Sequence, residues 1–330
     1  MQHSLPSNGL TRRQLSVAVM AALAACRVSA GNWPERPIRL LVGFPPGGGP
    51  DLLARALADA LQTARGWNVV VVNKPGAGGN LGTDEVARAA PDGYTVLFGH
   101  VGALAVNPSL YRRLSFDPQK DLVPVSMLAT SPLVIVTGTD RPFRSFREVV
   151  DEARKRPGTI SAGFSGTGTI SHLSLTQLAA LSGTRLSFVP YKGASQGIVD
   201  VVGGNLDLYV SSMASLLGHV RNGKVRALAV TSAGRAPDLP DVATLSEQGF
   251  PGFEATTWFG MMAPVATPAA VVNELQHGVE VALKSPALLE RYRTDGSEAV
   301  SSTSVAFGRF LQSETQRWAK VVREAGVEVQ

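Results

Sequence analysis

Residues 38–51 read Ile-Arg-Leu-Leu-Val-Gly-Phe-Pro-Pro-Gly-Gly-Gly-Pro-Asp. The apolar start of this stretch predicts a buried strand over 38–44, and the helical spacing of leucines and alanines predicts a helix over 51–64. Glycines between a strand and a helix let the backbone approach a ligand, and the free N–H groups of the helix start favour an anion. The stretch therefore predicts an anion-binding loop, with an ordinary tight turn as the alternative.

The same alternation of short strands and amphipathic helices continues along the chain. After the first helix we expect, in order, a strand, a helix and a strand at 69–72, 82–90 and 95–98. A second unit of strands and helices follows at 159–163, 171–181, 186–189, 195–203, 206–210, 215–222 and 226–230. Such alternation predicts an α/β fold with parallel sheets, helices on both faces, and ligands beyond the carboxyl ends of the strands.

Two long apolar stretches, 123–136 and 255–263, are suited to cross between the two units. The helices expected at 268–282 and 304–325 would then return to the first unit. The resulting boundaries are residues 31–129 plus 255–330 for domain 1 and 130–254 for domain 2, after a leader of residues 1–30. A chain that crosses twice between domains predicts a hinge.

Composition excludes several classes of protein. The chain has 330 residues, 44% hydrophobic and 17% charged, which is typical of a well-packed globular protein. Without the three arginines of residues 1–30, its 28 basic and 26 acidic residues leave a net charge of +2. Because it also lacks basic runs interleaved with aromatics, we expect no nucleic-acid partner. A single cysteine and dispersed histidines predict no disulfide framework, no metal site and no cofactor.

The N-terminus has the pattern of an export signal. Arg12 and Arg13 precede an apolar stretch at 17–26 and a small-x-small exit at Val28-Ser29-Ala30, in the manner of a twin-arginine signal. This pattern predicts a periplasmic protein. Two fates of Cys26 stay open: removal with the leader, or lipidation as the first residue of the mature chain.

Further glycine-rich loops precede two other expected helices. The loop Asn73-Lys74-Pro75-Gly76-Ala77-Gly78-Gly79-Asn80-Leu81-Gly82 misses the dinucleotide fingerprint because Leu81 replaces its third glycine, so NAD is not expected. The loop Phe164-Ser165-Gly166-Thr167-Gly168-Thr169-Ile170-Ser171-His172 adds hydroxyls, for which a simple helix cap is the alternative. One such loop in each domain predicts a shared site for a small anion.

One motif suggests catalysis. Gly193-Ala194-Ser195-Gln196-Gly197 matches the nucleophile elbow of serine hydrolases, and a triad would need Asp200 or Asp207 with His219 or His277. The motif is short and arises easily in a chain rich in glycine and serine. We therefore expect no enzyme, and we keep a secreted esterase using Ser195 as the alternative.

The ordered motifs resemble the Bug family, the extracytoplasmic solute receptors of tripartite tricarboxylate transporters. The resemblance runs over nearly all of 33–326 and is carried by Trp33-Pro34-Glu35-Arg36-Pro37-Ile38, Phe44 to Gly49 with Asp51, Asn73 to Thr83, Ala90-Pro91-Asp92-Gly93-Tyr94, Asn107-Pro108-Ser109-Leu110-Tyr111, Ser171-His172-Leu173, Val189-Pro190-Tyr191-Lys192-Gly193, Leu239-Pro240-Asp241-Val242 and Trp258-Phe259-Gly260.

The resemblance implies a two-domain periplasmic-binding-protein fold of type II that closes like a flytrap on a small carboxylate held by backbone amides and water. It implies a monomeric receptor that serves integral-membrane transporter subunits; a sensor of the same fold that reports to a signalling partner is the alternative. The ligand-binding residues carried over are Phe44, Gly47, Gly48, Gly49, Asp51, Asn80, His100, Ser165, Gly166, Thr167, Gly168, Ser171, His172 and Ser211.

Three positions depart from the family pattern. Pro50 replaces a usual Thr, His100 a small hydroxyl residue and Ser211 a common Asp. Because Ser211 neither repels a second carboxylate nor pairs with an amine, we expect a preference for plain organic acids over amino acids.

Overall fold

The first strands and helices form the expected parallel unit. The structure, a computed structural model, describes residues 33–325. Strand β1 (Ile38–Val42) pairs in parallel with β2 (Val69–Asn73) and β3 (Thr95–His100). Between them lie α2 (Gly49–Arg65), η1 (Ala77–Gly79) and α3 (Asn80–Ala87). The predicted β-α-β-α-β order is confirmed. We call these strands and the helices packed on them the first lobe.

The second parallel unit is also present. Its elements are β5 (Ser161–Phe164), α6 (Ile170–Ser182), β6 (Ser187–Pro190), α7 (Ala194–Val202), β7 (Leu208–Ser212), α8 (Met213–Arg221) and β8 (Val225–Val230). Strand β5 pairs in parallel with β6 and β7. These elements, with α5 (Phe146–Lys155), form what we call the second lobe.

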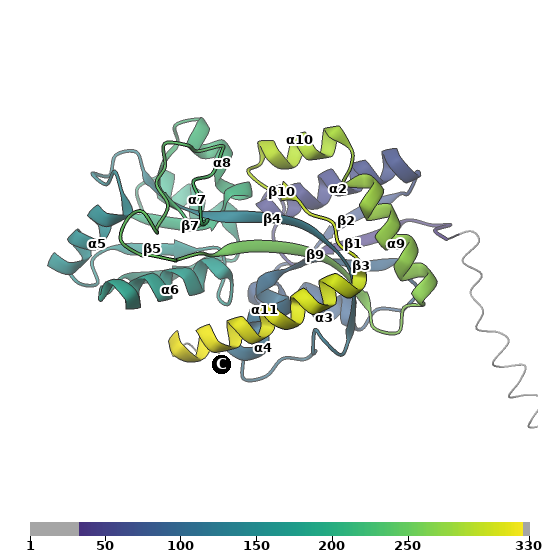
Figure 1. Cartoon of the computed structure of the whole chain (residues 1–330). Helices are drawn as coiled ribbons and strands as arrows, with labels where there is room; N and C mark the ends of the chain where they lie inside the picture. Colours follow the sequence, from purple (N-terminus) through teal and green to yellow (C-terminus); the bar gives the residue numbers. More distant parts are fainter. Residues whose placement is uncertain (1–32, 326–330) are drawn as a thin grey trace, which may run out of the picture. The chain divides into compact units, whose positions relative to one another are not determined.

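Two long strands run between the lobes (Figure 1). Strand β4 (Leu122–Gly138) pairs along its first part with β9 (Thr256–Pro264), and β9 pairs with β3. From Leu133 onward, β4 pairs with β7 and β8 instead, and all of these pairs are antiparallel. The sheets are therefore mixed, and the prediction of parallel sheets is wrong for β4, β8 and β9. One strand is therefore shared by the sheets of both lobes, where the apolar stretches predict a crossing. The exact domain boundaries, at 129/130 and 254/255, stay a prediction.

The remaining elements cover the sheets. Helix α9 (Ala269–Ala282) and α10 (Pro286–Thr294) both contact α2, so this part of the chain lies against the first lobe. Helix α11 (Ser304–Ala325) contacts β4, α6 and the π-helical turn η2 (Gly102–Val106), so it reaches both lobes. The sequence reasoning omitted η2, α4 (Asn107–Leu110), α5, α10 and β10 (Glu298–Ala299).

The core follows the alternation of the shared strand. Leu133 and Ile135 of β4 pack into one apolar cluster, whereas Val134 and Val136 pack into another. Successive side chains of a strand point to opposite faces, so β4 anchors a cluster on each side of the sheet. None of the helices within 33–325 combines the length and apolar character that crossing a bilayer needs. The predicted leader and Cys26 lie outside the described residues.

Candidate functional site

A cavity lies where the carboxyl ends of strands from both lobes meet. The first lobe contributes the loop after β1 and the end of β3, and the second contributes the start of α6, the start of α7 and the β7–α8 junction. The space is narrow, because only about 20 Å³ is open to the centre of a water molecule. That is room for little more than one water. The lining residues are Phe44, Pro45, Gly48, Pro50, His100, Leu133, Ser165, Thr169, Ile170, Ser171, Ala194, Ser211, Ser212, Ser215, Thr257 and Phe259.

Six of the predicted residues lie on this wall: Phe44, Gly48, His100, Ser165, Ser171 and Ser211. Of the other eight, seven lie in the same two loops or in the first turn of the helix that follows each: Gly47, Gly49, Asp51, Gly166, Thr167, Gly168 and His172. Asn80 lies elsewhere, at the start of α3. The structure therefore brings the two predicted loops together. Which of the fourteen residues touch a ligand stays a prediction.

Asp51 organises the first loop. Its buried carboxylate accepts hydrogen bonds from the Gly47 N–H at 2.8 Å and from Asn73 Nδ2 at 2.9 Å, and it pairs with Arg55 at 2.9 Å. Burial by itself raises the pKa of Asp51, but the hydrogen bonds from Arg55, Gly47 and Asn73 outweigh it and hold the pKa below its usual value. Because this carboxylate stays charged and accepts a hydrogen bond from Gly47 of its own loop, it holds the loop in place at the start of α2.

Hydroxyl groups organise the second loop. Thr169 donates to the Gly166 carbonyl at 2.7 Å and lies 2.8 Å from Ser171 Oγ, which in turn lies 3.1 Å from Ser165 Oγ. Gly168, at φ 81°, has a backbone conformation that favours glycine. The loop thus presents three linked hydroxyls at the start of α6.

The lobes meet through glycines. A Cβ added to Gly78 would lie 2.4 Å from the Thr167 carbonyl oxygen, and one on Gly193 would lie 2.6 Å from Pro45 Cδ. One on Gly168 would lie 2.2 Å from Asn107 Oδ1, and Asn107 Nδ2 donates to Asn80. Asn80 therefore supports a contact between the lobes. Side chains larger than hydrogen at these glycines would hold the lobes apart.

The two predicted histidines lie in different elements, His100 at the end of β3 and His172 in the first turn of α6. The His100 ring lies on the wall of the cavity, between the rings of Phe44 and Phe259. The His172 ring instead stacks on Phe164, with ring centroids 4.5 Å apart. Burial lowers the pKa of His100 to about 3 and that of His172 to about 4, so both are neutral at pH 7.

Several lining residues were missed by sequence reasoning. Ser212 and Ser215 lie at the start of α8, and Ser215 faces the first lobe, where its Oγ accepts from the Gly49 N–H. Thr257 and Phe259 face it from β9, and their period-two spacing is a signal that could have found them. The remaining ones are Pro45, Pro50, Leu133, Thr169, Ile170 and Ala194. No acidic, lysine or arginine side chain of the described chain is among the lining residues.

The catalytic alternative has little geometric support. Ser195 is exposed on α7, and within the described chain no hydrogen bond joins it to a histidine. Asp200 accepts from the Tyr191 hydroxyl at 2.7 Å, and Asp207 pairs with Arg141 and accepts from Ser161. Both candidate aspartates are engaged elsewhere. Residues 33–325 also contain no cluster of three or more His, Cys, Asp or Glu side chains able to hold a metal.

Comparison with known proteins agrees with this geometry. Residues 53–327 match the family model described as tripartite tricarboxylate transporter family receptor. The chain is 39% identical to protein BugT of Bordetella pertussis, over 97% of this chain and 99% of that protein. It is 37% identical to a UPF0065 protein of Pseudomonas sp. strain P51, over 95% of this chain and 94% of that protein.

Solved structures give the same result. The periplasmic binding protein BugD has a TM-score of 0.87 and 37% identity, covering 90% of this chain and all of its own. MatC from Rhodopseudomonas palustris, solved with bound malate, has a TM-score of 0.83 and 29% identity, covering 88% and 100%. A further R. palustris protein, solved with adipate, has a TM-score of 0.87 and 33% identity, covering 90% and 99%. The two-lobed α/β fold is thus that of periplasmic binding proteins.

Proposed function

This chain belongs to the tripartite tricarboxylate transporter receptor family, and from that premise we propose that it captures a small organic carboxylate between its lobes and delivers it to integral-membrane transporter subunits. A role as solute-binding receptor follows from the family and from its structural relatives. The finer parts of the proposal are the ligand class, the residues that hold the ligand and the delivery partner.

The observation that carries the proposal is the convergence of four helix starts on one uncharged cavity. Helices α2, α6, α7 and α8 all begin at its wall. Helix starts carry free N–H groups and a partial positive charge, which favour an anion without any cation nearby. Hydrogen bonds to a charged group contribute about 1.5–3 kcal/mol each, so about four of them match the roughly 8 kcal/mol of micromolar binding.

We assign the fourteen predicted residues to binding in two ways. Those on the wall, such as Ser165, Ser171 and Ser211, contact the carboxylate. Those behind it, such as Asp51 and Asn80, hold the loops that contact it. In the proposed domain division, 31–129 plus 255–330 against 130–254, opening occurs by bending of β4 and β9.

The proposal also covers location and assembly. The family implies a periplasmic protein, and we propose that the mature chain is a monomer. Intact-mass measurement of the chain from its natural host distinguishes the two fates of Cys26. Cleavage after Ala30 gives an unmodified chain starting at Gly31, whereas a lipoprotein starts at a diacylglyceryl Cys26.

Binding without turnover tests the function. Carboxylates bound only by the native state raise the melting temperature, by an amount that grows with their concentration. We expect such a shift for at least one member of a carboxylate panel, and no hydrolysis of activated esters. Ester hydrolysis that Ser195→Ala abolishes would instead support the esterase.

A further inference from the structure

His100 is held rigidly at the end of β3. Its ring centroid lies 4.9 Å from that of Phe44 and 5.6 Å from that of Phe259. The antiparallel pairing of β3 with β9 places His100 directly opposite Phe259. The residue is 8% exposed and lies on the cavity wall. Two aromatic neighbours and a strand register therefore fix where this imidazole points.

One ring nitrogen of His100 is already engaged. The Gly102 N–H donates to His100 Nδ1 at 2.9 Å. A nitrogen that accepts from a backbone N–H carries no proton, so the proton of the neutral ring is on Nε2. Burial keeps the ring neutral, since it lowers the pKa of His100 to about 3. No residue of the described chain accepts a hydrogen bond from Nε2.

The Nε2–H of His100 differs from the other polar groups on the wall because it cannot accept a hydrogen bond. The other polar side chains on the wall are serine and threonine hydroxyls, which donate or accept as a ligand requires. Nε2–H can only donate. Because Nε2–H cannot accept and no carboxylate lies on the wall, an ammonium group placed against His100 would face a second donor and would have only neutral hydroxyl oxygens to replace its water.

We propose that His100 is a specificity-determining residue, a fixed Nε2–H donor that selects ligands with a carboxylate or carbonyl oxygen at this end of the cavity and rejects ligands with an ammonium group there. This inference rests on the proposed function and narrows its ligand class to organic acids carrying a second oxygen acceptor.

The first test needs no ligand. In the full-length mature protein labelled with ¹⁵N-histidine, the two ring nitrogens report which one carries the proton. We expect the neutral Nε2–H form of His100 throughout pH 5 to 8, with assignment by His100→Gln. A Nδ1–H ring, or a ring that takes up a second proton near pH 6.5, would overturn the inference.

The second test uses matched ligand pairs that differ in one end group. The pairs are succinate with 4-aminobutanoate, adipate with 6-aminohexanoate, and terephthalate with 4-(aminomethyl)benzoate. We expect the dicarboxylate of the binding pair to bind at least tenfold more tightly by calorimetry. Equal affinity for the ammonium member would overturn the inference alone. If no carboxylate binds or raises the melting temperature, the proposed function fails, and the inference fails with it.

Variants then assign the selectivity to one side chain. His100→Leu should weaken dicarboxylate binding by about tenfold to a hundredfold and abolish the discrimination, as loss of one hydrogen bond to a charged group predicts. His100→Gln, which restores an N–H donor, should retain most of the affinity. His277→Leu, at an exposed position on α9, is the control.

If His100→Leu is folded, as judged by its melting curve, and still discriminates between the members of the pair, the inference is wrong. If His100→Leu does not fold, two measurements still test the inference: the affinity of His100→Gln, and the ratio of the wild-type affinities for the two members of the binding pair.

Discussion

The Gly49 N–H, at the start of α2, donates a 3.0 Å hydrogen bond to Ser215 Oγ, at the start of α8. The two helices belong to different lobes, so this bond joins them directly across the cavity. The Gly47 N–H donates instead to the Asp51 carboxylate. Because the Gly49 N–H donates to Ser215, a ligand carboxylate that accepts from it must replace Ser215 Oγ in this contact.

A substitution at Gly49 tests whether the close contact between the starts of α2 and α8 is needed for ligand binding. A Cβ at Gly49 would lie 2.7 Å from Ser215 Oγ and 3.0 Å from Ala214 Cβ. Gly49→Ala should therefore hold the lobes apart and weaken carboxylate binding at least tenfold. Small-angle scattering should show that the variant no longer contracts when malate or adipate, whichever binds, is added. Gly218→Ala is the matched control, because nothing lies within 4 Å of that added Cβ; equal effects of the two changes would contradict the prediction.

Asp51→Asn should destabilise the protein by about 1–3 kcal/mol at pH 7, the usual cost of weakening buried hydrogen bonds to a charged group. The pKa of Asp51 is lower in the folded protein than the ordinary 3.8, so its contribution is complete well above that pH. The contribution is lost as the pH falls through the folded pKa. Urea unfolding at several pH values should show the two proteins converging in acid. A difference that is unchanged or larger at pH 2 would refute this account of the loop.

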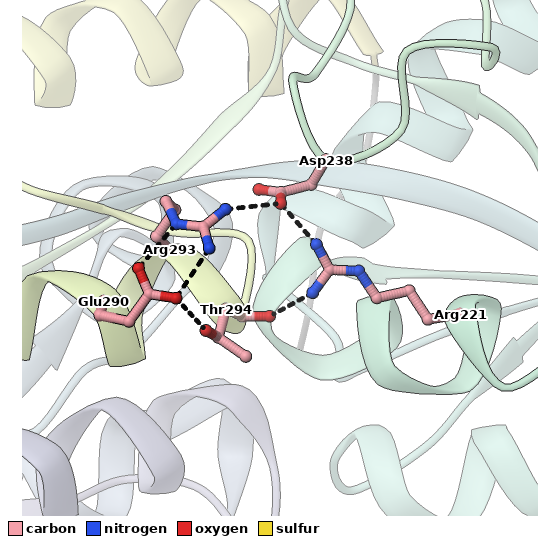
Figure 2. A network of polar contacts seen from close by, with 5 residues as sticks. All are labelled: Arg221, Asp238, Glu290, Arg293 and Thr294. Atoms are coloured by element: carbon pink, nitrogen blue, oxygen red, sulfur yellow. Dashed lines mark hydrogen bonds and ion pairs between the residues drawn. The ribbon is translucent and has the colours of Figure 1, made fainter.

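A second contact between the lobes lies at α8 and α10, where Figure 2 shows Arg221, Asp238 and Arg293 in one polar network. Arg221 donates to the Thr294 carbonyl at 3.1 Å and pairs with Asp238, which lies 3.7 Å from Arg293. Because these groups are partly exposed, the network stabilises the closed lobes only modestly. Arg221→Ala should weaken ligand binding by no more than about fivefold, with less effect in high salt.

Arg291→Ala is the control for the Arg221 change. Arg291 pairs with Asp295 on the same stretch of chain and does not join the lobes. Its removal should leave affinity unchanged. A loss of affinity as large as that of Arg221→Ala would show that both act through α10 rather than through the contact between lobes.

Chelation should leave the protein unaffected. Since residues 33–325 hold no cluster of metal-binding side chains, excess EDTA should change neither the melting temperature nor carboxylate affinity. A melting temperature that drops by several degrees and recovers with a divalent cation would show that a metal takes part.

The sequence predicts those features of the fold and of the site that neighbouring residues determine, and it misses those that depend on residues far apart in the chain. The strand and helix order, and the glycine loops after β1 and β5, follow from periodicity and composition, and the structure confirms them. The orientation of His172 does not follow, because the position of Phe164 decides it. Ser215 reaches the cavity only through the approach of two lobes distant in sequence. Helix α10 was missed because its apolar side is small and only Leu288 and Tyr292 are buried.

A crystal structure with a bound carboxylate tests the central claim most directly. We predict carboxylate oxygens within hydrogen-bond distance, about 2.7–3.2 Å, of backbone N–H groups at the starts of α2 and α6 or α8. No arginine or lysine should touch them. A carboxylate held by a guanidinium or ammonium group, or bound outside the cavity between the lobes, would contradict the account.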